Sequence, residues 1–281
     1  MNKMGNISIR QLSGSLGAEI KGIDLNELTD GETAKSIDTA FYEHVVLVFP
    51  NQSLSPAKQV AFTERFGAVE EHPLRTRRSA PGFPGLLILE NKPGRPGARN
   101  DYWHSDISHA KRPPALSVLH ALTVPENRGD TMFCNMYAAY DALSDGLRKR
   151  LENMRAVHSG EVTAERARRR KDTDALPIEK VAPPRSHPVV RTHPHSGHKA
   201  LFINPHFTLR FDGMTDEESA PLLGYLYEVA TRPEHVYRHR WVSGDVVMWD
   251  NRCAMHYGVY DYDEIMPRLM HRTTAAGEVP Y

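Results

Sequence analysis

The feature that most limits the possible folds is a long series of short apolar, strand-like segments with few helices between them. We expect strands at residues 45–49, 86–89, 115–122, 130–133, 189–192, 200–203, 236–241, 245–249, 256–259 and 269–274. A Rossmann fold or a TIM barrel would need strands and helices in regular alternation, which this order does not show. The pattern therefore predicts a mainly β fold with added helices, of the jelly-roll barrel type.

A few helix signals interrupt the strands. Apolar residues recur at helical spacing between about residues 30 and 44. Ser55 can cap a second helix, whose first position suits Pro56. Residues 136–154 predict two short helices, and residues 215–218 carry a capping-box pattern that opens a last one. These helices are additions to the β fold.

Residues 161–186 are polar, charged and poor in large apolar side chains. Such a composition buries too little apolar surface to order itself, so we expect a mobile loop, which would suit a lid over a site. The chain has no internal repeat and no low-complexity tract. One domain spanning residues 1–281 is the simplest organisation for this length.

Charge and composition count against several classes of partner. The chain has 35 Lys and Arg against 35 Asp and Glu, so no broad electrostatic field favours nucleic acid or an anionic membrane. The basic run at residues 166–170 has no interleaved aromatic residue for base stacking. This run is therefore interpreted as a solvated surface rather than a nucleic-acid-binding site.

Two further features bear on the compartment. The N-terminus has no apolar signal region, and no apolar stretch is long enough to span a membrane. Cys134 and Cys253 form no C-x-x-C pair, which argues against a disulfide framework or a structural zinc site. We expect a cytoplasmic protein.

The segment Tyr102-Trp103-His104-Ser105-Asp106 carries a candidate metal site. On an extended strand the side chains of His104 and Asp106 would project from the same face. Non-haem iron(II) oxygenases use two His and one carboxylate on one side of the metal and leave the other positions open. A second histidine must then come from elsewhere, and a lone His-x-Asp pair is weak evidence because short motifs arise by chance.

The C-terminal region supplies candidates for the rest of the site. His256 follows a predicted strand and a turn, so it can return to the barrel interior as the third ligand. Arg268 and Arg272 lie four residues apart on a predicted strand and should point to the same side. A guanidinium grips a carboxylate with two parallel hydrogen bonds, which suits a dicarboxylate co-substrate. Taken singly, each also has an ordinary interpretation as a packed histidine or a surface arginine.

The order of the motifs is more specific than any one of them. His-x-Asp is followed by Gly129-Asp130-Thr131, then by W-D-N-R-x-x-x-H ending at His256, and finally by R-x-x-x-R. In this order the chain resembles the iron(II)- and 2-oxoglutarate-dependent dioxygenases of the taurine dioxygenase and aryloxyalkanoate dioxygenase family. The resemblance extends over nearly the whole chain, through segments such as LGAEIKGIDL, VLVFPNQSLS, GDTMFCNMYAAYDAL and YRHRW.

The resemblance implies a double-stranded β-helix, a cupin-like jelly roll, and a role for each matching residue. His104, Asp106 and His256 would bind Fe(II), and Thr131 and Arg268 would hold the distal carboxylate of 2-oxoglutarate. O2 would be the second co-substrate, and 2-oxoglutarate would be converted to succinate as a substrate C–H bond is hydroxylated. Members of the family often form dimers or tetramers, so a homo-oligomer is possible.

The signals for the substrate conflict. His72, Asn100 and Arg272 match positions that resemble the sulfonate and amine contacts of the taurine branch, which favours a small anionic organosulfonate such as taurine, with release of sulfite and an aldehyde. YRHRW, GDTMFC and AAYDAL look closer to the aryloxyacetate enzymes. An aryloxyalkanoate, an alkyl sulfate or another small acid that is only hydroxylated is therefore an alternative. A catalytically silent jelly-roll binding protein is a further alternative, against which the intact set of metal and co-substrate residues argues.

Overall fold

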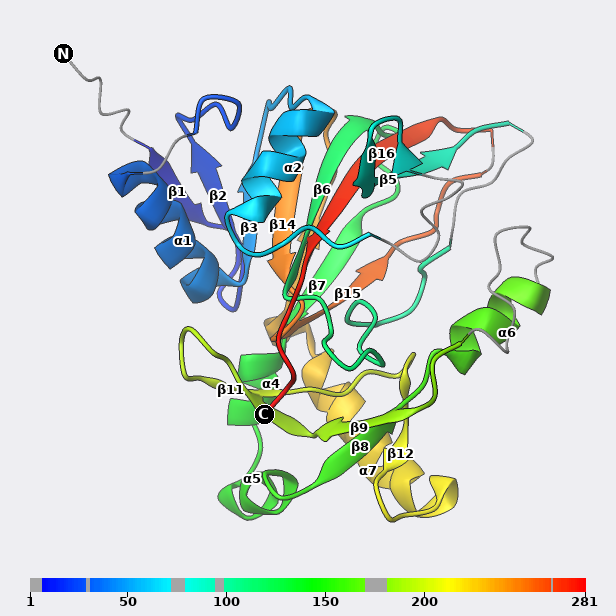
Figure 1. Cartoon of the computed structure of the whole chain (residues 1–281). Helices are drawn as coiled ribbons and strands as arrows, with labels where there is room; N and C mark the ends of the chain where they lie inside the picture. The colour runs from blue at the N-terminus through cyan, green and yellow to red at the C-terminus, as the bar shows by residue number, and fades with distance from the viewer. Residues whose placement is uncertain (1–6, 29–30, 72–78, 94–98, 170–180, 264) are drawn as a thin grey trace.

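The computed structural model describes residues 7–28, 31–71, 79–93, 99–169, 181–263 and 265–281, without the side chains of residues 166–168 (Figure 1). Its largest element is an eight-stranded sheet in the order β1-β2-β3-β14-β6-β16-β5-β4. In that order the strands are β1 (Ser8–Gln11), β2 (Ala18–Lys21), β3 (Val46–Phe49), β14 (Val246–Asp250), β6 (Leu116–Thr123), β16 (Arg268–Ala275), β5 (Phe83–Asn91) and β4 (Ser79–Ala80). Strands from both ends of the chain therefore interleave in one sheet.

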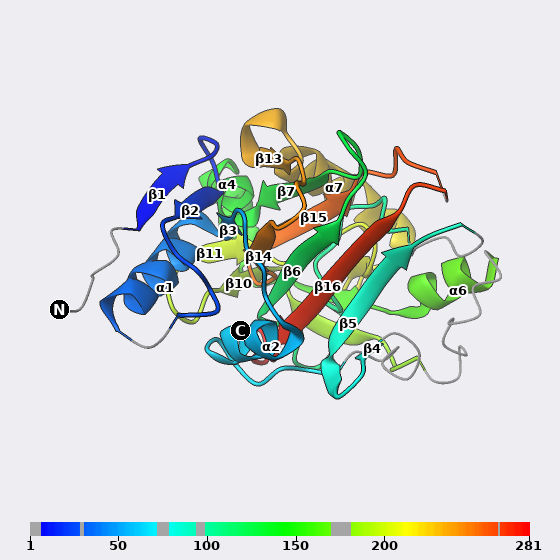
Figure 2. The same ribbon diagram turned by 90° about the horizontal axis from the view of Figure 1, so that it is seen from above.

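A second sheet of three antiparallel strands packs against one face of the first (Figure 2). Its strands, in spatial order, are β13 (Val236–His239), β7 (Thr131–Asn135) and β15 (Ala254–Gly258). The rings of Phe133 on β7 and Trp249 on β14 lie 5.6 Å apart between centroids, across the space between the sheets. Two facing sheets built from interleaved strands confirm the predicted mainly β, jelly-roll fold.

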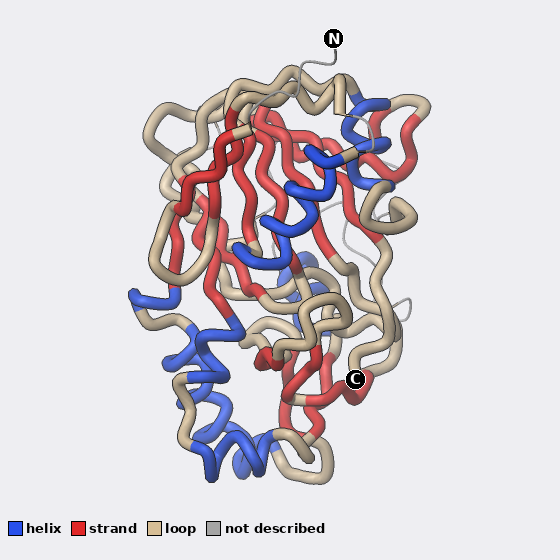
Figure 3. The backbone as a smooth tube through the Cα atoms, turned by 90° about the vertical axis from the view of Figure 1, so that its left-hand side faces the viewer, coloured by secondary structure: helices blue, strands red, loops and turns tan. Residues whose placement is uncertain are grey.

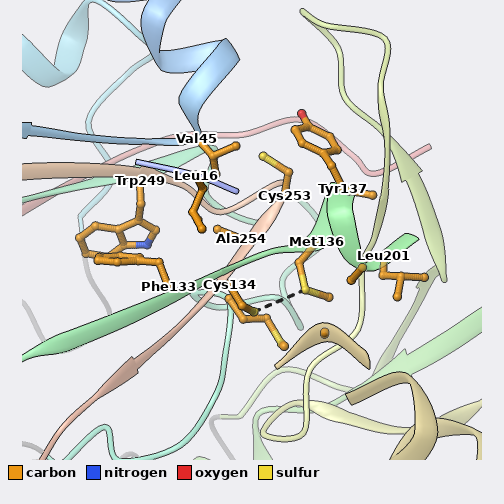
Figure 4. Close-up of a cluster of buried hydrophobic side chains, with 14 of the residues drawn as sticks. Leu16, Val45, Phe133, Cys134, Met136, Tyr137, Leu201, Trp249, Cys253 and Ala254 are labelled. Atoms are coloured by element: carbon orange, nitrogen blue, oxygen red, sulfur yellow. Dashed lines mark hydrogen bonds between the residues drawn. The ribbon is translucent and has the colours of Figure 1, made fainter. Parts of the chain in front are cut away.

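Alternation along the strands gives the large sheet two buried faces. On β14, Val246 and Met248 belong to the core under the helices, whereas Val247 and Trp249 belong to the core between the sheets. Figure 4 shows part of this inner core, where Phe133 lies against Trp249. Because both faces are covered, such a strand is apolar throughout and does not alternate with polar residues.

Two helices cover the outer face of the large sheet (Figure 1). Helix α1 (Glu32–His44) buries Ile37 and Phe41 and packs against β3 and β14. Helix α2 (Pro56–Glu64) packs against β5, β6 and β16, and the side chain of Ser55 caps it as predicted by accepting a hydrogen bond from the backbone N–H of Lys58. The two helices thereby cover the outer face of the large sheet.

The opposite end of the molecule is built from short strands and helices (Figures 1 and 3). These are β8 (Arg155–His158), β9 (Arg185–Pro188), β10 (Val190–Thr192), β11 (Lys199–Leu201), β12 (Thr208–Phe211), α4 (Met136–Asp141), α5 (Asp145–Leu151), α7 (Asp216–Ala230) and the 3-10 turn η2 (Pro233–His235). The predicted capping box at the start of α7 is present. Among the described residues no helix combines the length and the apolarity needed to cross a membrane.

The structure differs from the sequence expectation in two respects. Strands β8, β9 and β12 were not predicted, because their four-residue sequences RAVH, RSHP and TLRF are too short and polar to show a pattern. Residues 161–186 were expected to be a loop, but helix α6 (Glu161–Arg169) occupies their first part and β9 begins at Arg185. The sequence of α6 is rich in Ala, Glu and Arg, which favour a helix even without large apolar side chains. Residues 170–180 lie outside the described residues, and a lid at 161–186 stays a prediction.

Candidate functional site

The three predicted metal ligands come together between the two sheets. His104 and Asp106 lie in the segment that leads into β6, and His256 lies on β15. Nε2 of His104 lies 3.8 Å from Oδ1 of Asp106, and Nε2 of His256 lies 3.7 Å from the same oxygen. All three side chains are buried, and one ligand atom from each lies within 4.8 Å of the others. The structure thus brings the distant histidine to the local pair.

Backbone pairing places the two histidines opposite each other. His104 and His256 exchange both backbone N–H···O=C hydrogen bonds, of 3.0 and 2.8 Å, as one rung of an antiparallel ladder. Nδ1 of His104 lies 3.0 Å from the carbonyl oxygen of Tyr102, which can only accept, so Nδ1 carries the proton. The lone pair of the neutral ring is then on Nε2, which faces Asp106.

The carboxylate of Asp106 is held by one oxygen and leaves the other available. Its Oδ2 accepts a 2.7 Å hydrogen bond from Oγ of Ser117 on β6 and lies 2.7 Å from Nη2 of Arg272 on β16. Its Oδ1 faces the two imidazoles. Second partners of this kind fix the orientation of a ligand carboxylate.

Burial and neighbouring charges set the protonation states at the cluster. Burial alone would raise the pKa of Asp106, but the Arg272 guanidinium, with the hydrogen bond from Ser117, outweighs it and holds this pKa well below its usual range. Burial lowers the pKa of His104, and burial together with His104 lowers the pKa of His256. One carboxylate and two neutral imidazoles result. These are the forms that bind a metal ion, because ligands must be deprotonated.

The donor set fits non-haem iron(II). Two imidazole nitrogens and one carboxylate oxygen gathered on one side form the 2-His-1-carboxylate set, which leaves coordination positions open for other ligands. Nδ1 of His256 has no hydrogen-bond partner among the described residues. Its ring is held by packing instead, 4.8 Å from the ring of Trp249 between centroids. The residues present could therefore hold the metal.

A pocket beside this cluster collects five of the predicted residues. It is lined by Asn100, Thr131, His256, Arg268 and Arg272. The hydroxyl and the imidazole come from the small sheet, and the two arginines come from the inner face of β16, on the same side as predicted. Apolar and aromatic side chains complete the walls, among them Leu119, Trp249, Tyr260 and Tyr262. Two guanidinium groups, a hydroxyl and an amide thus converge beside the candidate metal.

The two arginines of the pocket differ in their surroundings. Arg272 is paired with Asp106, and its Nη2 also donates to Oγ of Ser117 at 3.3 Å. Arg268 makes no ion pair among the described residues, its Nε has no hydrogen-bond partner there, and its guanidinium lies 5.9 Å from the ring centroid of Tyr262. An unpaired guanidinium can bind an anion without giving up an existing partner.

The remaining predicted residues are placed as follows. The side-chain oxygen of Asn100 accepts a 3.1 Å hydrogen bond from the Tyr102 hydroxyl, and Oγ1 of Thr131 accepts a 3.0 Å hydrogen bond from Nε1 of Trp241. His72 lies outside the described residues, so its substrate contact stays a prediction.

Sequence reasoning assigned no role to two residues that shape the site. Ser117 contacts both Asp106 and Arg272, and Trp241 contacts Thr131. A lone serine within the apolar run 115–122 was an available signal for the first. Trp241 ends the YRHRW segment, but nothing in the sequence gave its partner.

A second buried cluster, His193, Asp250 and Cys253, also places ligand-type atoms within 4.8 Å of one another. Arg252 forms a bidentate pair with Asp250, at 2.8 and 2.6 Å, and Nε2 of His193 lies 3.0 Å from the same carboxylate. Burial raises the pKa of the Cys253 thiol well above its usual value, so no thiolate is offered. Both carboxylate oxygens already have partners, which makes this cluster an ion-pair network rather than a metal site.

Comparison with known proteins agrees with this geometry. The sequence model of the family described as "Taurine catabolism dioxygenase TauD, TfdA family" matches residues 8–274. The match runs from β1 into β16 and includes both halves of the candidate metal cluster and both arginines of the pocket.

Individual relatives are similar over almost their whole length. An alkylsulfatase of Acinetobacter baylyi is 36% identical over 284 residues, which cover 99% of this chain and 87% of that protein. An alpha-ketoglutarate-dependent 2,4-dichlorophenoxyacetate dioxygenase of Cupriavidus pinatubonensis is 38% identical over 272 residues, which cover 92% of this chain and 93% of that protein. The solved structure of AAD-2 in complex with Mn(II) and N-oxalylglycine matches with a TM-score of 0.81 at 34% identity, over 98% of this chain and 99% of that one. The chain therefore belongs to the taurine catabolism dioxygenase TauD/TfdA family.

Proposed function

We propose that the protein is an Fe(II)- and 2-oxoglutarate-dependent dioxygenase that hydroxylates a small anionic organic substrate. The observation that carries the proposal is that one pocket is lined by His256 of the metal cluster, the hydroxyl of Thr131 and both Arg268 and Arg272, of which Arg268 makes no ion pair among the described residues. A metal, a dicarboxylate and a second anion would lie within reach of one another in this pocket.

Each part of the pocket has a task in this reaction. His104, Asp106 and His256 would hold Fe(II), which activates O2 while 2-oxoglutarate is oxidised and decarboxylated to succinate. Arg268 and Thr131 would hold the distal carboxylate through charge-assisted hydrogen bonds. The apolar walls of the pocket would exclude water from the reacting groups.

Arg272 and Asn100, with His72 as a predicted third contact, would hold the prime substrate. Nε of Arg272 has no partner among the described residues, so it can donate to a substrate oxyanion while Nη2 stays on Asp106. The main candidate is an organosulfonate such as taurine. Hydroxylation of the carbon that bears sulfur gives a product that breaks down to an aldehyde and sulfite.

Two other substrate classes would also present an oxyanion to Arg272, a sulfate ester in one and a carboxylate in the other. The similarity to an alkylsulfatase supports an alkyl sulfate, and the similarity to a 2,4-dichlorophenoxyacetate dioxygenase supports an aryloxyalkanoate. In both cases hydroxylation beside the oxygen would release the leaving group, sulfate or a phenol. A small acid that is hydroxylated without fragmenting remains a further candidate.

The test is an anaerobic titration of the purified protein with Fe(II) and 2-oxoglutarate, followed by each substrate class in turn. We expect a visible charge-transfer band from the metal chelate of 2-oxoglutarate, and a shift of that band when the correct anion is added. Admission of O2 should then yield succinate in step with the released sulfite, sulfate or phenol. The absence of any band would contradict the proposal, and a band without turnover would favour the silent binding protein.

We infer a working organisation from the same observations. One domain over residues 1–281 would carry the site, with 161–186 as a lid. The lid is supported by Thr163 on α6, whose Oγ1 lies 2.7 Å from Nε2 of His206, while the ring of His206 stacks on Tyr102 at 3.8 Å between centroids.

Both cysteines are free and buried, which suits a reducing cytoplasm. The dimer or tetramer implied by the resemblance would be tested by sedimentation.

A further inference from the structure

We propose that Trp241 is a positioning residue that turns the Thr131 hydroxyl into a hydrogen-bond donor toward the co-substrate, and that this makes the end of the pocket selective for an ionised carboxylate. The inference rests on the proposed function. It adds a residue outside the pocket that determines which 2-oxo acid the pocket prefers.

The geometry begins with the indole of Trp241. This side chain is 5% exposed, and its Nε1 lies 3.0 Å from Oγ1 of Thr131. An indole N–H can only donate, so Oγ1 is the acceptor whatever proton positions are chosen. The same ring packs against the ring of His239, which lies 4.6 Å away between centroids and perpendicular to it, and this contact restricts its orientation.

The consequence for Thr131 follows from its single proton. A hydroxyl has one O–H to donate, and the indole now occupies one of its acceptor positions. Among the described residues Oγ1 of Thr131 has no hydrogen-bond acceptor for that proton. Because Thr131 lines the pocket, the proton is available to a ligand bound there.

Arg268 adds further hydrogen-bond donors to the same pocket. Its guanidinium has no carboxylate partner among the described residues and lines the same pocket as Thr131. A guanidinium only donates, and an ionised carboxylate only accepts, with two oxygens that can take several hydrogen bonds. These two donor groups in the pocket therefore suit a carboxylate, whereas an alkyl group in its place would leave the buried donors without partners.

The strand that precedes Trp241, β13, is held by contacts with its neighbours. Arg238, three residues before Trp241, places its Nε 2.7 Å from Oδ2 of the buried Asp130, the neighbour of Thr131. β13 pairs with β7 along its whole length, with His239 opposite Thr131. Thr131 lies on β7, and Trp241 follows two residues after the end of β13, so the pairing of these strands limits how far the hydroxyl and the indole can move apart.

The experiment compares two 2-oxo acids of equal chain length on the full-length protein loaded with Mn(II). 2-Oxopentanoate carries a methyl group where 2-oxoglutarate carries the distal carboxylate. Dissociation constants from anaerobic calorimetry give the preference of each variant for 2-oxoglutarate. Thr131→Val removes the hydroxyl at nearly constant shape and should reduce the preference roughly 10- to 100-fold, as expected for a hydrogen bond to a charged group. Trp241→Phe keeps the hydroxyl and should reduce it about 2- to 10-fold.

The double variant and two controls separate positioning from general damage. Trp241→Phe combined with Thr131→Val should show only the loss of Thr131→Val, because the indole acts through the hydroxyl. Thr131→Ser should retain the preference. Tyr237→Phe removes a partly buried hydrogen bond of β13, that between Tyr237 and His239, and should leave the preference unchanged.

The outcomes are distinct. If Trp241→Phe weakens the binding of both acids equally, Trp241 does not orient the hydroxyl and the inference is overturned. The same holds if the double variant loses the product of the two single losses of preference. If the parent protein binds neither acid in the presence of metal, the proposed function fails instead.

Discussion

Arg268 and Arg272 offer a sharp test, because they lie four residues apart on β16 but stand in opposite electrostatic situations. Arg272 lies 2.7 Å from the buried carboxylate of Asp106, whereas Arg268 has no ion pair among the described residues. Arg272→Ala leaves Asp106 buried beside two neutral imidazoles with only Ser117 to stabilise its charge. Arg268→Ala removes a charge that has no partner to lose.

The expected magnitudes differ accordingly. Loss of one partner of a buried ion pair costs about 3–5 kcal/mol of unfolding free energy. For a protein of this size that corresponds to a decrease in Tm of roughly 10 °C in the metal-free state. Arg268→Ala should leave the Tm of the metal-free protein nearly unchanged or raise it. The same variant should bind 2-oxoglutarate much more weakly than the parent.

Calorimetric melting with and without Mn(II) provides the assay. A divalent ion supplies positive charge beside Asp106, so Mn(II) should restore more of the Tm of Arg272→Ala than it adds to the parent. Arg272→Lys keeps the charge and should melt nearer to the parent. Equal losses of Tm in the two alanine variants without metal would refute the assignment of a paired and an unpaired arginine.

Three further predictions follow from other parts of the structure. His256→Ala should abolish Mn(II) binding, and residual stoichiometric binding would show that another cluster holds the metal. Burial lowers the pKa of His158 to about 3 and that of His187 to about 4, so the unfolded chain binds these protons at a higher pH than the folded protein does. The free energy of unfolding should therefore have its full value above about pH 6.5 and decrease as the pH falls toward 4. A constant Tm over this window would contradict the prediction. Arg252→Ala leaves Asp250 buried without its cation and should cost about 3–5 kcal/mol in denaturant unfolding, with no change in metal stoichiometry.

Much of the site could be predicted because its signals are local. His104 and Asp106 needed only the two-residue repeat of an extended chain, and Arg268 and Arg272 needed only the same repeat over four residues. Arg268 and Arg272 lie on β16 as this repeat requires. His104 and Asp106 are not on a regular strand, because His104 forms an isolated bridge and Asp106 begins a turn, but Nε2 of His104 still lies 3.8 Å from Oδ1 of Asp106. The fold class was likewise predicted from the order of strands and helices.

Other features depend on which segments meet, and no local pattern carries that information. Strand β14 inserts between β3 and β6, nearly two hundred residues from the former in sequence. The short strands β8, β9 and β12 form only because each finds a partner to share hydrogen bonds, so their own composition did not reveal them. Helix α6 formed where composition had predicted a loop.

The sequence by itself determined the chemistry of this protein: two imidazoles, a carboxylate and two guanidinium groups in an order typical of one family. Only the tertiary structure decided their states, because pairing and burial arise between segments that are distant in the chain. It paired Arg272 with Asp106, left Arg268 without a partner among the described residues, and directed the indole of Trp241 at Thr131. The energies of these contacts depend on distance and on exclusion from water, and a linear sequence contains neither.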